Sequence, residues 1–323
     1  MALKTDYKDY IPPSGGRKYK ITANSDGSSS VEDITQYQQV GDTWGAEDIN
    51  QVNKLLNGAV YPNLLDNSDF TNPVNQRSEA VYDYLTGIGY GPDRWQLVEA
   101  KYTLASQTVT SAGSSHTYGS QLRQIIPLEK IKIGDTVTAS ISTESGILNG
   151  TAKLELKIDT SVSDLPYVIE QDWGGVKIGC IKENVCHVIV FLKENKSVKI
   201  NWVKLEKGSV ATPYVPKAFG DELLECLRYF VGGVGIGSAG IVSGSTFRVL
   251  IPTPVPMRTA PSVTVKVADN VVYNGTFKAL NTTVSNITRQ RNGIHLHIGM
   301  AASGVNNYPG IAYGLQCDLS ADL

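Results

Sequence analysis

Apolar and polar residues alternate along short stretches in the middle of the chain, which is the pattern of half-buried strands. Turn residues separate these stretches at the spacing typical of a two-sheet sandwich. The alternating stretches are 95–101, 121–126, 136–142, 152–158, 176–181, 185–192 and 198–205. We therefore expect residues 61–218 to form one β-sandwich domain.

A hairpin is predicted near the start of the chain, within a first segment that we place at residues 1–60. Apolar and polar residues alternate in 19–22 and again in 31–35. Between them, residues 24–27 read Asn-Ser-Asp-Gly, a sequence that favours a tight turn. Two alternating stretches joined by a turn predict a pair of antiparallel strands.

A helix is predicted after this hairpin, over residues 44–57. Its first turn carries acidic residues, which suit the positive end of a helix dipole. Ile49, Val52 and Leu56 are three and then four residues apart, which makes a narrow apolar seam of the kind used between parallel helices. A helix packed on its own hairpin is the alternative interpretation.

A proline-stiffened strap and a second short helix follow the last strand of the sandwich. Pro213 and Pro216 hold the backbone extended and exclude a helix through them. Asp221 then begins an amphipathic pattern that continues to Val231, and we expect Gly232 and its neighbouring glycine to end the helix. This succession marks a domain boundary, so residues 219–323 form the predicted third domain.

Clean alternation returns in the third domain, which we expect to be a small β domain with one short helix. Its size gives it a small core, and such a unit often needs a partner chain. The stretches that carry the alternation are 247–251, 262–267, 285–289 and 293–298. Overall, the pattern predicts a mostly β protein.

Composition sets limits on the partners of this protein. The chain has 323 residues with 41% hydrophobic and 19% charged residues, which is ordinary for a soluble multidomain protein. A formal net charge of −2 argues against nucleic acid as a partner. The chain has no apolar run long enough for a membrane span and no apolar signal core near Met1. We therefore expect it to stay in the cytoplasm where it is made unless something else carries it out.

The cysteines and the motif content give no sign of a catalytic centre. The four cysteines, Cys180, Cys186, Cys226 and Cys317, are not at zinc-finger spacing. We expect them to be buried thiols in a reduced compartment, with a Cys180–Cys186 disulfide as the alternative. The common hydrolase, metalloprotease and phosphate-loop motifs do not occur. We expect no enzymatic activity and no cofactor, apart from the structural metal ion discussed below.

Several strings resemble the tail fibre proteins of phages and prophages of Gram-positive hosts. The longest is "W-x-x-L-E-x-G-S-x-A-T-P-Y-x-P" followed by "C-x-R-Y-F", which begins at Trp202 and ends at Phe230. A "G-A-x-D-I-N-x-x-N" string begins at Gly45, and a "P-M-R-x-x-P" string begins at Pro256. Further matches resemble the jelly-roll modules of such proteins, which are similar to carbohydrate-binding modules. These matches lie at 63–70, 90–95, 122–127 and 134–140.

The resemblance implies a receptor-binding protein of a phage tail. It implies that the first segment attaches to the tail or baseplate, that the jelly roll is a spacer or sugar-binding module, and that the last domain contacts the host. It also implies a parallel homotrimer, located in the virion tail and assembled in the host cytoplasm. Two other functions stay open: a wall-polysaccharide depolymerase and a purely structural baseplate component.

Aromatic and amide side chains are the candidate sugar contacts, because a sugar ring stacks on an aromatic ring and hydrogen-bonds to amides. Near the C-terminus they gather in a segment with few charges, from Ala302 to Tyr313, which we expect to be an exposed loop. The candidates there are Tyr308, Tyr313, Asn306 and Asn307. The candidates in the sandwich are Tyr90 and Trp173.

Two pairs of residues are candidate metal ligands. His295 and His297 lie two apart on a predicted strand and therefore share a face. Three such pairs around a trimer axis would bind a transition metal, and the alternative is a solvent-facing polar pair. Asp66 and Asp69 are the second candidate, for calcium.

Overall fold

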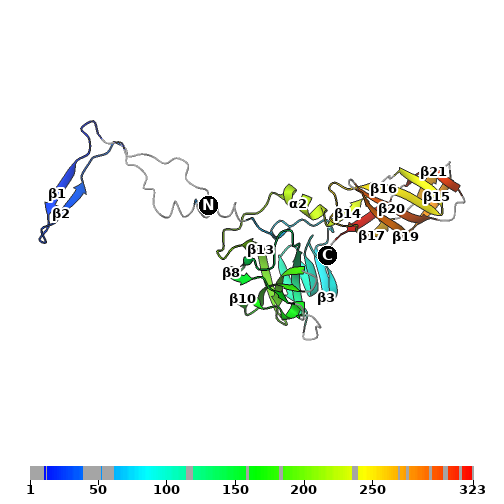
Figure 1. Cartoon of the computed structure of the whole chain (residues 1–323), viewed down its shortest axis with the longest axis horizontal. Coiled ribbons are helices and arrows are strands. Elements are labelled where there is room, and N and C mark those ends of the chain that lie inside the picture. The colour runs from blue at the N-terminus through cyan, green and yellow to red at the C-terminus, as the bar shows by residue number, and fades with distance from the viewer. Residues whose placement is uncertain are drawn as a thin grey trace. The chain divides into compact units, whose positions relative to one another are not determined.

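The computed structural model divides into two compact units, Met1–Asn57 and Gly58–Leu323 (Figure 1). The residues that the structure describes are 11, 13–38, 52, 62–113, 119–157, 160–181, 185–234, 239–267, 270–273, 276–290, 293–300, 305–312 and 315–321. Within them, only the backbone is described for 267, 270, 273, 276, 277, 282 and 305–308. None of the described helices is long and apolar enough to cross a membrane.

The first unit contains the predicted hairpin. Strand β1 (Tyr19–Ala23) pairs antiparallel with β2 (Ser29–Asp33), and Ile21 lies opposite Val31. The predicted helix over 44–57 lies outside the described residues, apart from Val52, and so does the rest of its apolar seam. The hairpin prediction is thus confirmed, and the helix stays a prediction.

The second unit begins with one large sheet that wraps around a single hydrophobic core. Its strand order is β10-β11-β12-β6-β4-β5-β13-β7-β8, with β3 paired to β4 and β9 paired to β11. The bounds are β3 Val81–Tyr90, β4 Gln96–Thr103, β5 Thr108–Ser111, β6 Ser120–Ile126, β7 Thr136–Thr143, β8 Gly146–Lys153, β9 Leu156–Lys157, β10 Tyr167–Gln171, β11 Gly174–Ile181, β12 Val185–Leu192 and β13 Ser197–Lys207, with a short 3-10 helix, η1, at Val162–Asp164. The mostly β prediction is confirmed, and each strand predicted in this region overlaps an observed one.

Strand β13 connects the two parts of this sheet. Its first residues pair with β5, and the remainder, from Ile200 to Lys207, pairs with β7. Along its other edge, Val203 and Leu205 form backbone hydrogen bonds with the segment at 64–68. The core beneath is aromatic where this segment ends, because Phe70 packs 5.1 Å from Trp95 between ring centroids.

The strap after β13 is fastened to that strand by its side chains. The rings of Trp202 and Tyr214 stack at 4.6 Å with an interplanar angle of 6°. Glu206 is fully buried and accepts a 2.8 Å hydrogen bond from the backbone N–H of Thr212. The buried Lys204 ammonium lies 3.1 Å from the Glu206 carboxylate. The strap is therefore part of the folded core and not a free linker.

Helix α2 is shorter than predicted. It spans Phe219–Leu227, whereas the sequence pattern predicted an apolar face that reaches Val231. Phe230 and Val231 belong instead to strand β14 (Phe230–Val234), where they pair with Ser320 and Leu319. The helix ends early because these buried residues gain strand partners from the C-terminus of the chain, a long-range contact that local spacing does not reveal.

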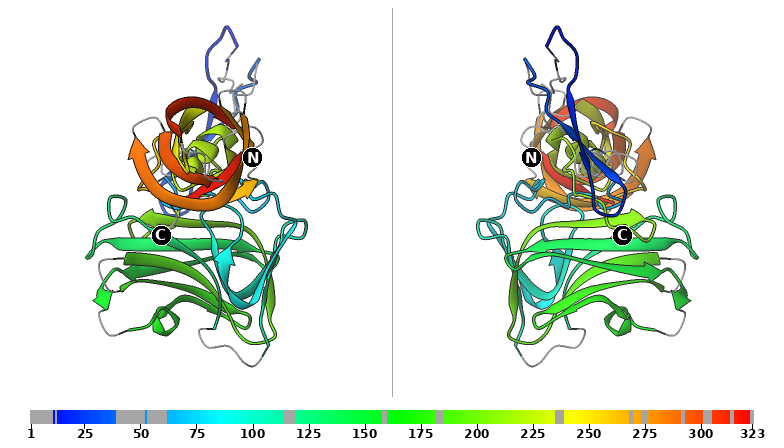
Figure 2. Two further views of the ribbon diagram at one scale, coloured as in Figure 1. Left: turned by 90° about the vertical axis from the view of Figure 1, so that its right-hand side faces the viewer. Right: turned by 90° about the vertical axis from the view of Figure 1, so that its left-hand side faces the viewer.

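The rest of the second unit is a three-stranded sheet and a closed six-stranded barrel. The sheet order is β14-β22-β17, and the barrel order is β15-β16-β20-β19-β18-β21, which forms a ring when viewed end-on (Figure 2). The bounds are β15 Ala239–Gly244, β16 Thr246–Pro252, β17 Ser262–Val267, β18 Asn270–Tyr273, β19 Thr276–Gln290, β20 Gly293–Met300, β21 Val305–Ala312 and β22 Gln316–Ser320. These strands enclose a second core cluster.

The expected exposed loop from Ala302 to Tyr313 is wrong for most of its length. Residues 305–312 form β21, which pairs with both β15 and β18 and so closes the barrel. Pro309 lies opposite Ile241, and Ile311 lies opposite Val272. Polar composition suggested a loop, but the backbone of this segment is required to complete the ring.

A buried ion cluster joins the segment after residue 62 to helix α2. The Asp66 carboxylate lies 2.6 Å from Lys130, 3.3 Å from Arg94 and 3.5 Å from Lys217. One residue later, the backbone N–H of Asn67 donates to the Glu222 carboxylate at 2.5 Å. These contacts hold the two core clusters of the second unit together, and the predicted domain boundary at 218/219 stays a prediction.

Two of the cysteines form a disulfide. Cys180 on β11 lies directly opposite Cys186 on β12, with 3.9 Å between their Cα atoms, and their sulfurs are bonded. The expectation of four thiols is therefore wrong for this pair, because strand register brings them face to face. Cys226 and Cys317 are buried and free, as expected.

Candidate functional site

One face of the large sheet carries a row of polar side chains between aliphatic ones. In the register of β4 and β6, Gln96 lies opposite Arg123, and Val98 lies opposite Gln121. On the next strand, Ile88 of β3 lies opposite Val98. Because side chains two apart share a face, these residues all project to the same side of the sheet.

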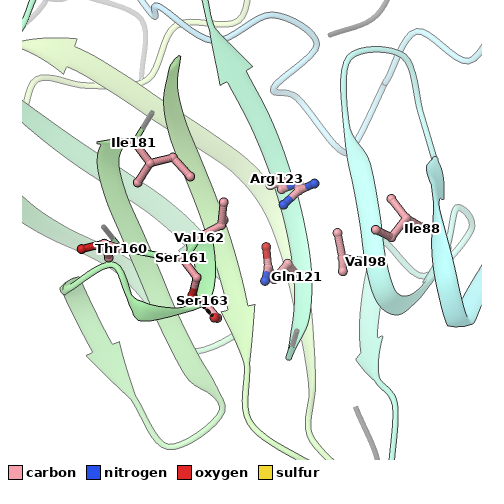
Figure 3. A pocket seen from close by; sticks show the side chains of 9 residues that line it. All are labelled: Ile88, Val98, Gln121, Arg123, Thr160, Ser161, Val162, Ser163 and Ile181. Carbon is pink, nitrogen blue, oxygen red and sulfur yellow. Dashed lines mark hydrogen bonds between the residues drawn. The ribbon is translucent and has the colours of Figure 1, made fainter. Parts of the chain in front are cut away.

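This face contains a cavity of about 290 Å³, which we call the polar groove. Gln121 and Arg123 project from β6 between the aliphatic side chains of β3 and β4 and the segment around η1 (Figure 3). The described residues that line the groove are Ile88, Val98, Gln121, Arg123, Thr160, Ser161, Val162, Ser163 and Ile181. It thus combines hydroxyl, amide and guanidinium groups with aliphatic walls.

The η1 segment is fixed in place as one wall of the polar groove. The Lys177 ammonium donates a 2.5 Å hydrogen bond to the carbonyl of Ser163 and lies 4.0 Å from the centroid of the Phe191 ring. Gly179 allows the chain to approach the sheet here, since a Cβ at that position would lie 2.5 Å from the Leu165 side chain. The wall is therefore positioned before any ligand arrives.

Arg123 is the central polar residue of the groove. Its Nε donates a 2.7 Å hydrogen bond to the amide oxygen of Gln96, which orients the guanidinium. Burial lowers the pKa of this guanidinium from its ordinary value. Arg123 also lines a separate and much smaller hollow, together with Tyr90, Gln96 and Ile125, near the end of β3.

A buried histidine lies on the same face of the sheet. His187 of β12 is opposite Ile125 of β6, two residues from Arg123. Burial, and next the charge of Arg123, lower the pKa of His187 to about 4. Its imidazole is therefore neutral at physiological pH, and its Nδ1 has no hydrogen-bond partner among the described residues. Sequence reasoning missed His187 because it sits in an otherwise apolar strand.

The structure separates the two predicted sugar contacts of the sandwich. Tyr90 ends β3 and lines the hollow next to the polar groove. Trp173 lies in the turn between β10 and β11, where it packs against the core, and it is not among the described lining residues. Gln121, Arg123 and the η1 segment had not been predicted as site residues.

The C-terminal candidates lie mostly outside the described part of the chain. Asn306, Asn307 and Tyr308 belong to β21 by their backbone, but their side chains are outside the described residues. Tyr313 lies outside them altogether. Their role in binding therefore stays a prediction.

The two candidate metal sites differ in their outcome. His295 and His297 project together from β20 with ring centroids 5.3 Å apart, so the shared face is confirmed and metal binding stays a prediction. The calcium prediction is wrong for Asp66, because the positively charged side chains of Arg94, Lys130 and Lys217 already surround its carboxylate. Asp69 instead accepts a hydrogen bond from the backbone N–H of Thr71 at 2.9 Å. Among the described residues, no group of three or more metal-ligating side chains occurs.

The chemistry of the polar groove suits a hydroxyl-rich ligand. Its donors and acceptors come from serine, threonine, glutamine and arginine side chains, and none of its described lining residues is acidic. Cleavage of a glycosidic bond uses a pair of carboxylates across the bond. The groove as described can hold and orient a polar ligand.

Comparison of the chain with models of known protein families, with curated proteins and with solved structures yields no match.

Proposed function

We propose that the protein is a receptor-binding component of a phage tail, with a jelly-roll module that holds a host cell-surface glycan in the polar groove. The observation that carries the proposal is the cavity of about 290 Å³ around Gln121 and Arg123. The tail-fibre strings around Trp202 and in the first segment support the same function. The protein would act by binding and not by catalysis.

The two kinds of wall in the polar groove match the two kinds of surface on a sugar ring. Ring hydroxyls would pair with Ser161, Ser163, Gln121 and Arg123, because a site with fixed donors and acceptors selects ligands that satisfy them. The C–H face of the ring would pack on the aliphatic side chains. A shallow site of this kind binds with a dissociation constant on the order of 1 mM, and several copies on one particle would raise the avidity by orders of magnitude.

We expect the variants Arg123→Ala and Val162→Trp to lose binding to host cells by at least about tenfold, the first by removing a donor and the second by filling the cavity. Fluorescently labelled full-length protein on a panel of bacteria measures this loss. Lys199→Ala, which removes an exposed cation of β13 outside the groove, is the control. If the receptor site instead lies around Tyr308 and Tyr313, the double variant Tyr308→Ala, Tyr313→Ala should lose binding to host cells. A parent protein that labels no bacterium would overturn the proposal in favour of a structural role.

We also propose a parallel homotrimer attached to the tail or baseplate through residues 1–60. The support is the small core of the last 105 residues or so, the predicted seam at Ile49, and the resemblance to tail fibres. We expect light scattering on the intact protein at micromolar concentration to give three times the chain mass. A monomer mass would contradict the proposal.

A further inference from the structure

Three arginines from distant parts of the sequence line one cavity of about 490 Å³ next to helix α2. Arg228 follows the helix, Arg258 lies between β16 and β17, and Arg289 lies near the end of β19. The other described lining residues are Leu224, Glu225, Val255, Pro256 and Met257. We call this space the arginine cavity.

Hydrogen bonds to backbone carbonyls tie the three arginines into one unit. The N–H of Arg258 donates to the carbonyl of Arg228 at 2.8 Å. The carbonyl of Arg258 in turn accepts a hydrogen bond from the Arg289 guanidinium, which also donates to the carbonyl of Met257 at 2.9 Å. The middle arginine is therefore fixed between the other two, and the cavity is built by contacts within the chain.

The charges in the arginine cavity are not balanced. Among its described lining residues, three guanidinium groups face a single carboxylate, that of Glu225, which lies 3.6 Å from Arg228. The whole chain has a formal net charge of −2, so this local excess of positive charge stands against the overall composition. Like charges held close together are unfavourable, and an anion placed between them relieves the repulsion.

A buried donor in the cavity lacks a partner. The Nη1 atom of Arg258 is shielded from solvent and has no acceptor among the described residues. Because this atom is closed to an incoming ligand, a bound anion would contact Arg258 through the other N–H groups of its half-exposed side chain. An oxyanion supplies several acceptors at once and matches the fork of a guanidinium.

We propose that the arginine cavity is a binding site for a phosphate ester. The phosphate oxygens accept hydrogen bonds from Arg228 and Arg258, and the carbon part of the ester packs on Leu224, Val255 and Met257. The apolar wall distinguishes an ester from free inorganic phosphate, which would leave that wall in contact with water. The site is separate from the polar groove and does not depend on the function proposed for it.

Isothermal titration of the full-length protein at constant ionic strength tests the proposal. We expect glycerol 3-phosphate to bind with a dissociation constant on the order of 1 mM. Inorganic phosphate should bind more weakly, and glycerol and sodium chloride should give no saturable heat. Arg258→Gln should weaken glycerol 3-phosphate binding at least about tenfold. Arg248→Gln, on an exposed position of β16, is the matched control and should leave binding unchanged.

A second variant keeps the test decisive if Arg258→Gln fails to fold. Arg258→Lys retains the charge and the aliphatic stem but loses the guanidinium fork. We expect it to melt at the parent temperature and still bind glycerol 3-phosphate more weakly. The proposal is overturned if the parent shows no saturable binding, if inorganic phosphate binds as tightly as the ester, or if both Arg258 variants bind like the parent.

Discussion

Replacing Asp66 by alanine is expected to lower the free energy of unfolding of the second unit by about 3–5 kcal/mol. The carboxylate lies in the middle of the ion cluster, within 3.5 Å of Lys130, Arg94 and Lys217. Without it, three positive charges face one another, and the Arg94 side chain, which is only 2% exposed, loses its carboxylate. A buried charge left without its partner is far more costly than the pair is stabilising.

Urea unfolding followed by tryptophan fluorescence measures the effect of Asp66→Ala. The control is Asp83→Ala, which removes one partner of the exposed pair Asp83–Lys101 and should change the free energy by under about 1 kcal/mol. A loss at Asp66 no larger than at Asp83 would contradict the prediction.

The same cluster predicts how stability depends on pH. Burial alone would raise the pKa of Asp66, but the charges of Lys130 and Arg94 outweigh it, so the pKa is lowered from 3.8. A carboxyl with a lowered folded-state pKa stabilises the fold above its unfolded value, and this contribution is lost as the pH falls through the folded value. The stability difference between the parent and Asp66→Ala should therefore shrink below about pH 4.

The alternating stretches were sufficient to predict the class of the fold. Period-two patterns such as 247–251 and 293–298 correspond to β16 and β20, because one face of each strand contacts a core. The hairpin of the first unit was equally readable from its turn residues. Strand β3 was missed, since its sequence contains Gly87 and Gly89 and half of its side chains face outward.

Contacts between distant segments decided what the sequence could not show. The early end of α2 and the strand identity of 305–312 both depend on partners far along the chain. The Cys180–Cys186 bond depends on strand register, which sets those residues opposite each other. A local pattern records the preference of a segment but not the identity of its partner.

Both proposed sites were hidden from the sequence for the same reason. Gln121 and Arg123 look like ordinary polar positions in a strand, and only the neighbouring β4 and the η1 segment turn them into a groove. In the arginine cavity, Arg228, Arg258 and Arg289 come from three separate parts of the chain. The net charge of −2, which argued against nucleic acid as a partner, gave no sign of this local cluster of arginines.

The tail-fibre string that begins at Trp202 gains a structural explanation. Its tryptophan stacks on Tyr214, and its glutamate, Glu206, holds Thr212. The residues of the string therefore lie on both sides of one contact, between β13 and the strap that follows it. The string thus corresponds to the contacts that hold this strap.

The buried pair Lys204–Glu206 within this fastening should show strong energetic coupling. The ammonium and carboxylate are 3.1 Å apart, with side chains 2% and 0% exposed. Thr212 connects them, since its hydroxyl accepts from Lys204 and donates to Glu206. Either single change, Lys204→Met or Glu206→Gln, leaves one buried charge alone and should lower the free energy of unfolding by about 3–5 kcal/mol.

The double variant Lys204→Met, Glu206→Gln should lose less than the sum of the two single losses, by about 2–3 kcal/mol, because it leaves no unpaired charge. The glutamine oxygen can still accept the hydrogen bond from the Thr212 N–H, so the strap keeps its backbone contact. Urea unfolding of the four proteins gives this coupling energy. The exposed pair Lys193–Glu170, 3.8 Å apart, is the matched control and should couple by under about 1 kcal/mol. Additive losses at Lys204 and Glu206 would mean that Thr212 and the backbone carbonyl of Pro213, which also contacts the ammonium, satisfy each charge independently of the other.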